Sequence, residues 1–274
     1  MITFTLDLED HRSDHRYEKR YPDIVRQLLV LLEQHQARGT FFVVGKVTEN
    51  DPELIKEIAN QGHELAFHSY DHRQLHLDNF EQFKQETDKG KKLLEDLSGQ
   101  AVIGYRAPVF SLTKNTLWAL DSLKESGFLY SSSVLPAANP LNGIESAPTT
   151  PFHWPNGLLE IPVPVMKFGP VNLPYLGGVY LRYLPAFFLM YLINKNQKTG
   201  LWTYCHPYDF DPDELFFMIK GASFLTSLIL WFNRKNTKKK ISLLLSHNLT
   251  IGEAMTFSEQ FHKGLFNTAP VFEL

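Results

Sequence analysis

The chain has 274 residues, of which 43% are hydrophobic, and this is enough for one α/β domain with a large core. The net charge is -3 at pH 7 and the basic residues are scattered, which argues against a nucleic-acid-binding protein. Cys205 is the single cysteine, so an internal disulfide is excluded. The first residues lack a basic segment followed by an apolar run, so we expect no secretory signal and a cytoplasmic location.

Hydrophobic periodicity predicts strands and helices that alternate along the chain. Apolar residues alternate over residues 2–8 and predict a strand that places Asp7 on the face opposite the apolar set. The later elements are predicted in this order: a helix over 22–37, a strand over 40–44, a helix from Pro52 to about Gly62, a strand over 64–67, a helix over 79–97, a strand over 102–105, a helix over 113–126, an apolar segment over 128–130 and a polar loop over 131–157.

This alternation predicts βαβ units and a parallel sheet, as in α/β folds. In such sheets, functional residues gather at the carboxyl ends of the strands. Asp7, His68, Arg106 and His206 each lie at or just after the end of a predicted strand. We therefore expect these four side chains to meet at one end of a single domain.

Two apolar stretches lie in the C-terminal part, at residues 179–193 and 215–232. Pro185 interrupts the first, which is also too short to span a bilayer. Lys220 and Gly221 interrupt the second, which argues against a membrane span. A buried core helix is the main expectation for these stretches, and a helix lying on a membrane surface is the alternative.

Histidines and carboxylates in the N-terminal half have the spacing of a metal site. If residues 68–72 form a helical turn, His68 and His72 share one face and can bind one ion. The acidic cluster over residues 7–10 supplies carboxylates, one as a metal ligand and a second as a base that takes a proton from water. Two imidazoles and a carboxylate suit one divalent ion, with Zn²⁺ first and Co, Ni, Fe or Mn as alternatives.

Five motifs, in order along the chain, carry a family resemblance. They are Thr5-Leu-Asp-Leu-Glu-Asp10, Gly39-Thr-Phe-Phe42, Gly62-His-Glu-Leu-Ala-Phe-His-Ser-Tyr-Asp-His72, Tyr105-Arg-Ala-Pro108 and Tyr204-Cys-His-Pro207. With these motifs the chain resembles the NodB-type polysaccharide deacetylases, metal-dependent enzymes of the carbohydrate esterase class. It is most similar to the branch associated with bacterial surface-polysaccharide biosynthesis.

The resemblance implies a fold and a set of catalytic roles. The implied fold is a distorted (β/α) barrel, of seven strands, within a single domain over residues 1–274 that has a C-terminal helical elaboration from about residue 179. Asp7 would be the catalytic base, Arg106 would keep it ionised, and His206 would be the general acid. His68 and His72 would bind the metal ion with an acidic residue. Tyr130 and Pro108 are the expected substrate or oxyanion contacts.

The sequence departs from the usual family pattern at two positions. Leu8 occupies the usual position of the acidic ligand, so Glu9 or Asp10 must take that role, and strand alternation favours Glu9 because it lies on the face of Asp7. Ser131 stands where related sequences often carry the aspartate that orients the catalytic histidine. Asp209 is a candidate to replace it. Separately, the pair Gly177-Gly178 predicts either a close approach to substrate or a plain turn.

The expected function is removal of an N-acetyl or formyl group from an amino sugar of a bacterial surface glycan or its lipid-linked precursor. The protein would act at the inner face of the membrane, with peripheral contact through the two apolar stretches. Two alternatives stay open at this point: a metal-dependent hydrolase of small cyclic amides, and a catalytically inactive glycan-binding relative.

Overall fold

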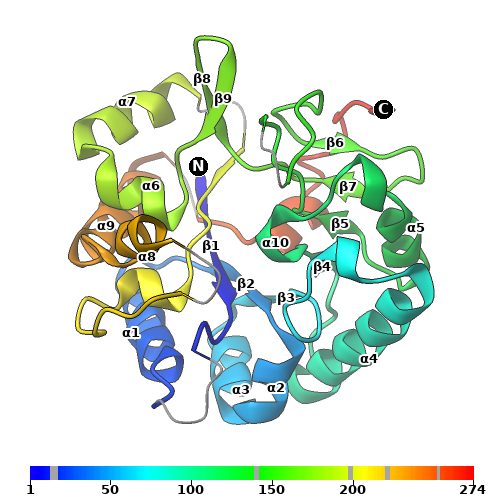
Figure 1. Cartoon of the computed structure of the whole chain (residues 1–274), viewed down its shortest axis with the longest axis horizontal. Coiled ribbons are helices and arrows are strands. Elements are labelled where there is room, and N and C mark those ends of the chain that lie inside the picture. Colours follow the sequence, from blue (N-terminus) through cyan, green and yellow to red (C-terminus); the bar gives the residue numbers. More distant parts are fainter. Residues whose placement is uncertain (13–17, 139–141, 197–199, 220–222, 252–253) are drawn as a thin grey trace.

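The computed structural model describes residues 1–12, 18–138, 142–196, 200–219, 223–251 and 254–274. Eight strands form a curled sheet in the order β10-β1-β2-β3-β4-β5-β7-β6, and helices lie around its outside (Figure 1). Its strands are β1 Ile2–Leu8, β2 Gly39–Val43, β3 Glu64–Phe67, β4 Gly104–Tyr105, β5 Tyr130–Ser131, β6 Phe152–His153, β7 Leu159–Glu160 and β10 Leu201–Trp202. The predicted distorted (β/α) barrel is confirmed.

The strand count differs from the expected seven for a simple reason. All neighbouring strands of the sheet pair in parallel except β6 and β7, which pair antiparallel. The eighth strand, β6, is joined to β7 by a tight connection closed by the bonds between Trp154 and Leu158 and between Gly157 and Trp154. It therefore extends the edge of a seven-stranded parallel arrangement.

The helices and a separate hairpin complete the chain. The helices are α1 Tyr21–Gln34, α2 Gly45–Asn50, α3 Pro52–Asn60, α4 Phe80–Ser98, α5 Trp118–Glu125, α6 Gly178–Tyr183, α7 Ala186–Lys195, α8 Phe224–Trp231, α9 Lys235–Ile251 and α10 Phe257–His262, and the hairpin is β8 Val165–Phe168 with β9 Val171–Pro174. The predicted elements of the N-terminal half are confirmed, but the helix expected over 113–126 begins only at Trp118, after a 3-10 turn over Lys114–Thr116.

Period-two alternation divides each central strand between two cores. On β1, Phe4 and Leu6 belong to the outer core between the sheet and the helices. On β2, Phe42 belongs to a second, inner cluster together with Tyr130 and Trp202. Because Asp7 alternates with Leu6 and Leu8, its side chain lies on the inner face. It is the last residue but one of β1, whose seven residues are all buried.

The two apolar stretches behave differently. The first forms α6 and α7 on either side of Pro185, and α7 buries Leu189, Leu192 and Ile193. The second forms only the short helix α8, where Ser227 is the one buried side chain of the eight described residues. The expected buried core helix over 215–232 is therefore wrong, and Lys220 and Gly221 lie outside the described residues. Among the described residues, no helix has the length and apolar character needed to cross a membrane.

Candidate active site

Asp7 and Arg106 form a buried ion pair at the centre of the site. Arg106 follows β4, and its backbone N–H donates to Phe67 O at 2.9 Å, which fixes it beside the end of β3. Its guanidinium donates to Asp7 Oδ1, and to Thr5 Oγ1 at 3.0 Å. The same group lies 3.7 Å above the Phe42 ring. Burial lowers the pKa of Arg106, and the charge of Asp7 opposes that shift.

The second oxygen of Asp7 is turned toward two imidazoles. Asp7 Oδ2 lies 3.9 Å from Nε2 of His68 and 3.8 Å from Nε2 of His206. The Asp7 backbone N–H donates to Cys205 O at 2.8 Å, which ties the end of β1 to the segment that carries His206. One carboxylate oxygen is thus held by Arg106, and the other is available to accept a proton between the two histidines.

Glu9, His68 and His72 converge next to Asp7. Their ligand atoms all lie within 4.8 Å of one another, and His72 Nε2 is 2.6 Å from Glu9 Oε2. The expected helical turn is wrong: the segment after β3 is an irregular loop in which Ser69 and His72 have φ of 62° and 61°. Such backbone in non-glycine residues costs free energy and is commonly found at functional sites. The loop folds back so that both imidazoles face Glu9.

This donor set fits a divalent metal ion. Nδ1 of His68 lies 2.8 Å from Arg106 O, and a carbonyl can only accept, so Nδ1 carries the proton and Nε2 keeps its lone pair for a metal. Burial lowers the pKa of His68 to about 4, which keeps the ring neutral. Burial alone would raise the pKa of Glu9, but its contacts with the three histidines lower it to about 2. The set therefore offers two imidazoles and one carboxylate, while Asp10 accepts from Arg12 N at 3.0 Å.

His206 lies across the site and is oriented by a residue of its own turn. Its Nδ1 is 3.3 Å from Asp209 Oδ2, and the same oxygen accepts the His206 backbone N–H at 2.9 Å. Nε2 faces Asp7, as above, and lies 3.9 Å from Glu9 Oε1. Burial alone would lower the pKa of His206, but the hydrogen bond to Asp209 and the charges of Glu9, Asp209 and Asp7 raise it to about 9.

Asp209, the candidate that the sequence offered in place of Ser131, is the carboxylate that contacts the His206 ring. It is buried, and Arg182 of α6 lies 3.4 Å from its Oδ1. Gly178 makes this approach possible, because a Cβ there would lie 1.9 Å from Asp209 Oδ2. The close approach allowed by the glycine pair is therefore to Asp209 rather than to substrate. Ser131 donates to Ser133 Oγ at 2.8 Å, and its side chain also contacts Glu160.

The two predicted substrate contacts have different outcomes. Tyr130 is fully buried, its hydroxyl donates to Glu64 Oε1 at 2.7 Å, and its backbone N–H donates to Ile103 O at 3.2 Å. Neither donor is left for a substrate oxygen, which corrects the prediction. Pro108 starts a 3-10 turn just after Arg106, and Val109 there has φ of 56° and is 50% exposed. Pro108 thus lies next to the site, and its contact with substrate stays a prediction.

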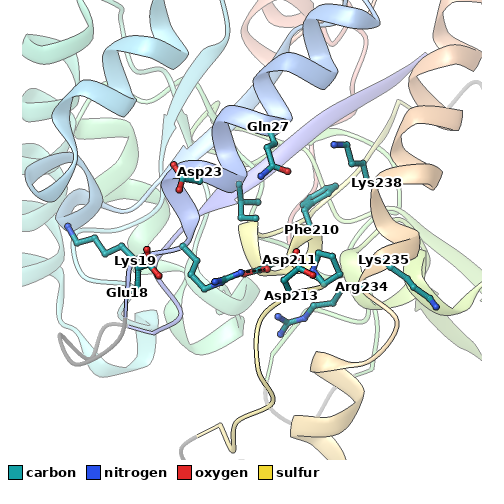
Figure 2. Close-up of a pocket in the computed structure, with 13 residues that line it drawn as sticks. Glu18, Lys19, Asp23, Gln27, Phe210, Asp211, Asp213, Arg234, Lys235 and Lys238 are labelled. Atoms are coloured by element: carbon teal, nitrogen blue, oxygen red, sulfur yellow. Dashed lines mark hydrogen bonds and ion pairs between the residues drawn. The ribbon is translucent and has the colours of Figure 1, made fainter.

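A separate cavity of about 410 Å³ lies between α1, α9 and the segment after His206 (Figure 2). Oppositely charged side chains line it, among them the paired Arg20 and Asp211, whose two contacts measure 2.5 and 2.8 Å. None of the predicted site residues, all of which are described, lines this cavity. The cavity is therefore separate from the cluster at the strand ends.

Two family models match consecutive parts of the chain. Residues 12–127 match the polysaccharide deacetylase model, and residues 132–256 match a domain of unknown function, DUF3473. The first match contains His68, His72 and Arg106, and Asp7 and Glu9 come just before it. The second contains Arg182, His206 and Asp209. The site therefore combines residues of both matched segments with two residues that precede them.

Known proteins of similar sequence and fold include polysaccharide deacetylases. A peptidoglycan-N-acetylglucosamine deacetylase of Bacillus cereus is 33% identical over 96 residues, which cover 35% of this chain and 35% of that protein. Such matches span about a third of the length of the curated relatives. A Mycobacterium smegmatis structure assigned to the polysaccharide deacetylases aligns with a TM-score of 0.65 at 19% identity, covering 100% of this chain and 94% of that one. An allantoinase aligns with a TM-score of 0.64 at 13% identity, over 97% and 90%. Residues 12–127 are therefore similar to the polysaccharide deacetylase family, and the chain as a whole has the fold of the solved structure assigned to that family.

Proposed function

We propose that the protein is a metal-dependent carbohydrate N-deacetylase that removes an N-acetyl or formyl group from an amino sugar. One observation carries the proposal: Asp7, Glu9, His68, His72, Arg106 and His206 converge at the carboxyl ends of neighbouring strands. The Bacillus relatives named as peptidoglycan deacetylases support the carbohydrate substrate class. We also infer a single domain over residues 1–274, because the inner core joins Phe42 and Tyr130 to Trp202 and Phe257.

In this proposal Glu9, His68 and His72 hold the metal ion. A divalent cation at these ligands supplies Lewis-acid activation of water and of the amide carbonyl, with Zn²⁺ as the first candidate. Asp7 Oδ2 accepts the proton of the attacking water, while Arg106 orients the carboxylate through Oδ1. His206 Nε2 donates a proton to the leaving amine nitrogen, since its raised pKa keeps the ring protonated at neutral pH.

The natural substrate of the proposal is a bacterial surface glycan or its lipid-linked precursor. The site accepts the acetamido group of a sugar because a base and an acid flank one set of metal ligands, as hydrolysis of an amide requires. A lipid-linked precursor is favoured by the exposed apolar helix α8, which would bring the site to a membrane surface.

Acetate release from a panel of substrates tests the proposal. Purified protein with added Zn²⁺ or Co²⁺ should release acetate from N-acetylglucosamine oligomers, and formate from N-formylated ones if the formyl group is used. Asp7→Asn should lower turnover by about 10²–10⁴-fold, because it removes the general base with little change in shape. Asp10→Asn is the matched control, since Asp10 is an adjacent carboxylate outside the metal-binding set, and it should keep turnover.

The same panel separates the competing functions. Ring opening of cyclic imides without acetate release would replace the deacetylase with a cyclic amide hydrolase. Glycan binding that is equal in the wild type and in Asp7→Asn, with no turnover of any substrate, would make the protein an inactive glycan-binding relative.

A further inference from the structure

A surface of exposed apolar side chains covers α7, α8 and the segments beside them. In the described part of the chain, nine of the eighteen exposed large apolar residues fall between residues 183 and 232. We call them the apolar surface: Tyr183, Phe187, Tyr191, Leu215, Met218, Phe224, Leu225, Ile229 and Phe232. Soluble monomers rarely expose so many large apolar side chains in one region, so this surface calls for a partner.

The members of the apolar surface are held together by contacts between α6 and α8. The Tyr183 ring stacks on the Phe232 ring at 6.4 Å and 23°. The Tyr183 hydroxyl donates to Ile229 O at 3.0 Å, and Arg182 donates to Leu230 O at 2.7 Å. In Figure 1 α6, α7, α8 and α9 lie together on one side of the molecule. The apolar surface is thus a defined feature of the fold.

Both helices turn apolar side chains outward. On α7, Leu189 and Leu192 are buried, while Phe187 and Tyr191, four residues apart, are 77% and 57% exposed on the opposite face. On α8, Phe224 and Leu225 are 61% and 64% exposed. A helix that packs on a protein core normally presents polar residues to water, so the outward faces of α7 and α8 are suited to an apolar environment.

Positive charge predominates around this surface. Residues 161–252 carry ten Lys and Arg and four acidic residues, although the whole chain has a net charge of -3. Three of the four acids are buried and lie beside arginines, and Asp213 is the exposed one. Lys235, Lys238 and Lys239 at the start of α9 are exposed. A second copy of the chain would bring the same cations and be repelled. The complementary partner is apolar in its interior and anionic at its surface.

We propose that the apolar surface docks onto a bilayer containing anionic phospholipid, with α7 and α8 lying in the interface and the α9 lysines on the headgroups. Amphipathic helices with basic residues beside an aromatic and aliphatic face bind membranes in this way. The docked protein lies on the bilayer, which agrees with the lack of a spanning helix among the described residues. Arg182 of α6 contacts Asp209, so the docking surface and the catalytic site share α6. The proposal does not depend on deacetylase activity.

Vesicle flotation tests the proposal. The full chain should float with vesicles of phosphatidylethanolamine and phosphatidylglycerol and remain largely unbound with phosphatidylcholine alone. Phe224→Ser/Leu225→Ser should lower the bound fraction by about tenfold, since binding scales with the apolar area buried. Val30→Ser/Leu77→Ser is the matched control: these side chains are 52% and 56% exposed outside the apolar surface, and the variant should float as the wild type does.

A charge variant and a lipid probe complete the test. Lys235→Glu/Lys238→Glu/Lys239→Glu should abolish the preference for phosphatidylglycerol, whereas Lys114→Glu/Lys124→Glu, at exposed positions elsewhere, should retain it. Brominated phosphatidylglycerol should quench Trp231 of α8 in otherwise unaltered protein, as judged against Trp231→Phe, so the proposal can be tested even if the serine variant fails to fold.

Two results would overturn the proposal. One is wild-type protein that stays unbound with both kinds of vesicle while Trp231 is not quenched. The other is a dimer in solution that Phe224→Ser/Leu225→Ser dissociates without any change in vesicle binding, because the apolar surface would then be an interface between two copies.

Discussion

The two halves of the site are held in place by different means. On the N-terminal side, backbone bonds between parallel strands fix the side chains: His68 N–H donates to Val43 O and Arg106 N–H donates to Phe67 O, each at 2.9 Å. On the C-terminal side, His206 follows β10, a strand of two residues, and depends on the carboxylate of Asp209, which Arg182 contacts. The segment before His206 also bonds to β1 through Cys205, but the His206 ring itself is oriented by the Asp209 side chain.

Removal of the general acid should have the largest effect on the C-terminal half. We expect His206→Gln to lower turnover by about 10²–10⁴-fold, because the leaving amine then lacks a proton donor. Metal content should stay the same, since His206 is outside the ligand set. Acetate release and metal analysis on the same sample measure both quantities, with exposed His76→Gln as the control. Loss of metal in His206→Gln would show that the two halves are not separate.

Loss of the orienting carboxylate should have the next largest effect. Asp209→Asn keeps the shape but removes a charge that raises the pKa of His206, and we expect turnover to fall by about 10–100-fold, as for other groups that orient a catalytic residue. In the wild type, turnover should fall as the pH rises through about 9, where His206 loses its proton.

The pH at which turnover falls on the alkaline side, here called the alkaline limb, distinguishes an electrostatic role of Asp209 from a structural one. In Asp209→Asn the pKa of His206 should be lower, so turnover should fall at a lower pH than in the wild type. An unchanged limb with reduced turnover would mean that Asp209 only supports the local fold.

Gly178→Ala should act on the site only by displacing the Asp209 carboxylate. The Cβ of Gly178→Ala would lie 1.9 Å from Asp209 Oδ2, so the carboxylate or the start of α6 must shift. We expect a loss of about 1–3 kcal/mol in the free energy of unfolding, the usual range for overpacking, measured by urea denaturation, with a parallel fall in turnover. Gly157→Ala is the comparison at a remote turn: because φ there is 80°, alanine is strained and the free energy of unfolding should also fall, but turnover should match the wild type. If Gly178→Ala is as stable and active as the wild type, the close approach is not required.

Ser131→Ala should have the smallest effect. Its hydroxyl bonds to Ser133 rather than to His206, so turnover and the pH limb should match the wild type. The lost hydrogen bond should lower the free energy of unfolding by only about 0.5–1.5 kcal/mol. A shift in the alkaline limb of Ser131→Ala would mean that Ser131 does help to orient His206.

Much of the first half could be predicted from the sequence, because strand alternation and strand ends are local patterns. Asp7, His68 and Arg106 follow from period-two segments and from the rule that functional groups gather at strand ends. The irregular loop at His72 could not be predicted, because its local sequence does not indicate a positive φ at a residue other than glycine.

The second half was harder to predict because its contacts join distant parts of the chain. The spacing of His206 and Asp209, three residues apart, was the one local signal for the orienting carboxylate. Arg182 and Gly178 approach Asp209 from a distant part of the sequence, and hydrophobic periodicity does not predict contacts of this kind. The main expectation of a buried helix was wrong for α8, because an apolar composition does not reveal whether other elements cover a helix.

Metal content tests the central claim most directly. After loading with Zn²⁺ and dialysis, the wild type should retain about one ion per chain, and His68→Ala and Glu9→Gln should retain far less, because each loses one of three ligands. Asp10→Asn and Asp7→Asn should retain the ion, since neither residue belongs to the ligand set. Full metal content in Glu9→Gln, with loss of the ion in Asp10→Asn, would contradict the assignment of Glu9 and with it the account of the site.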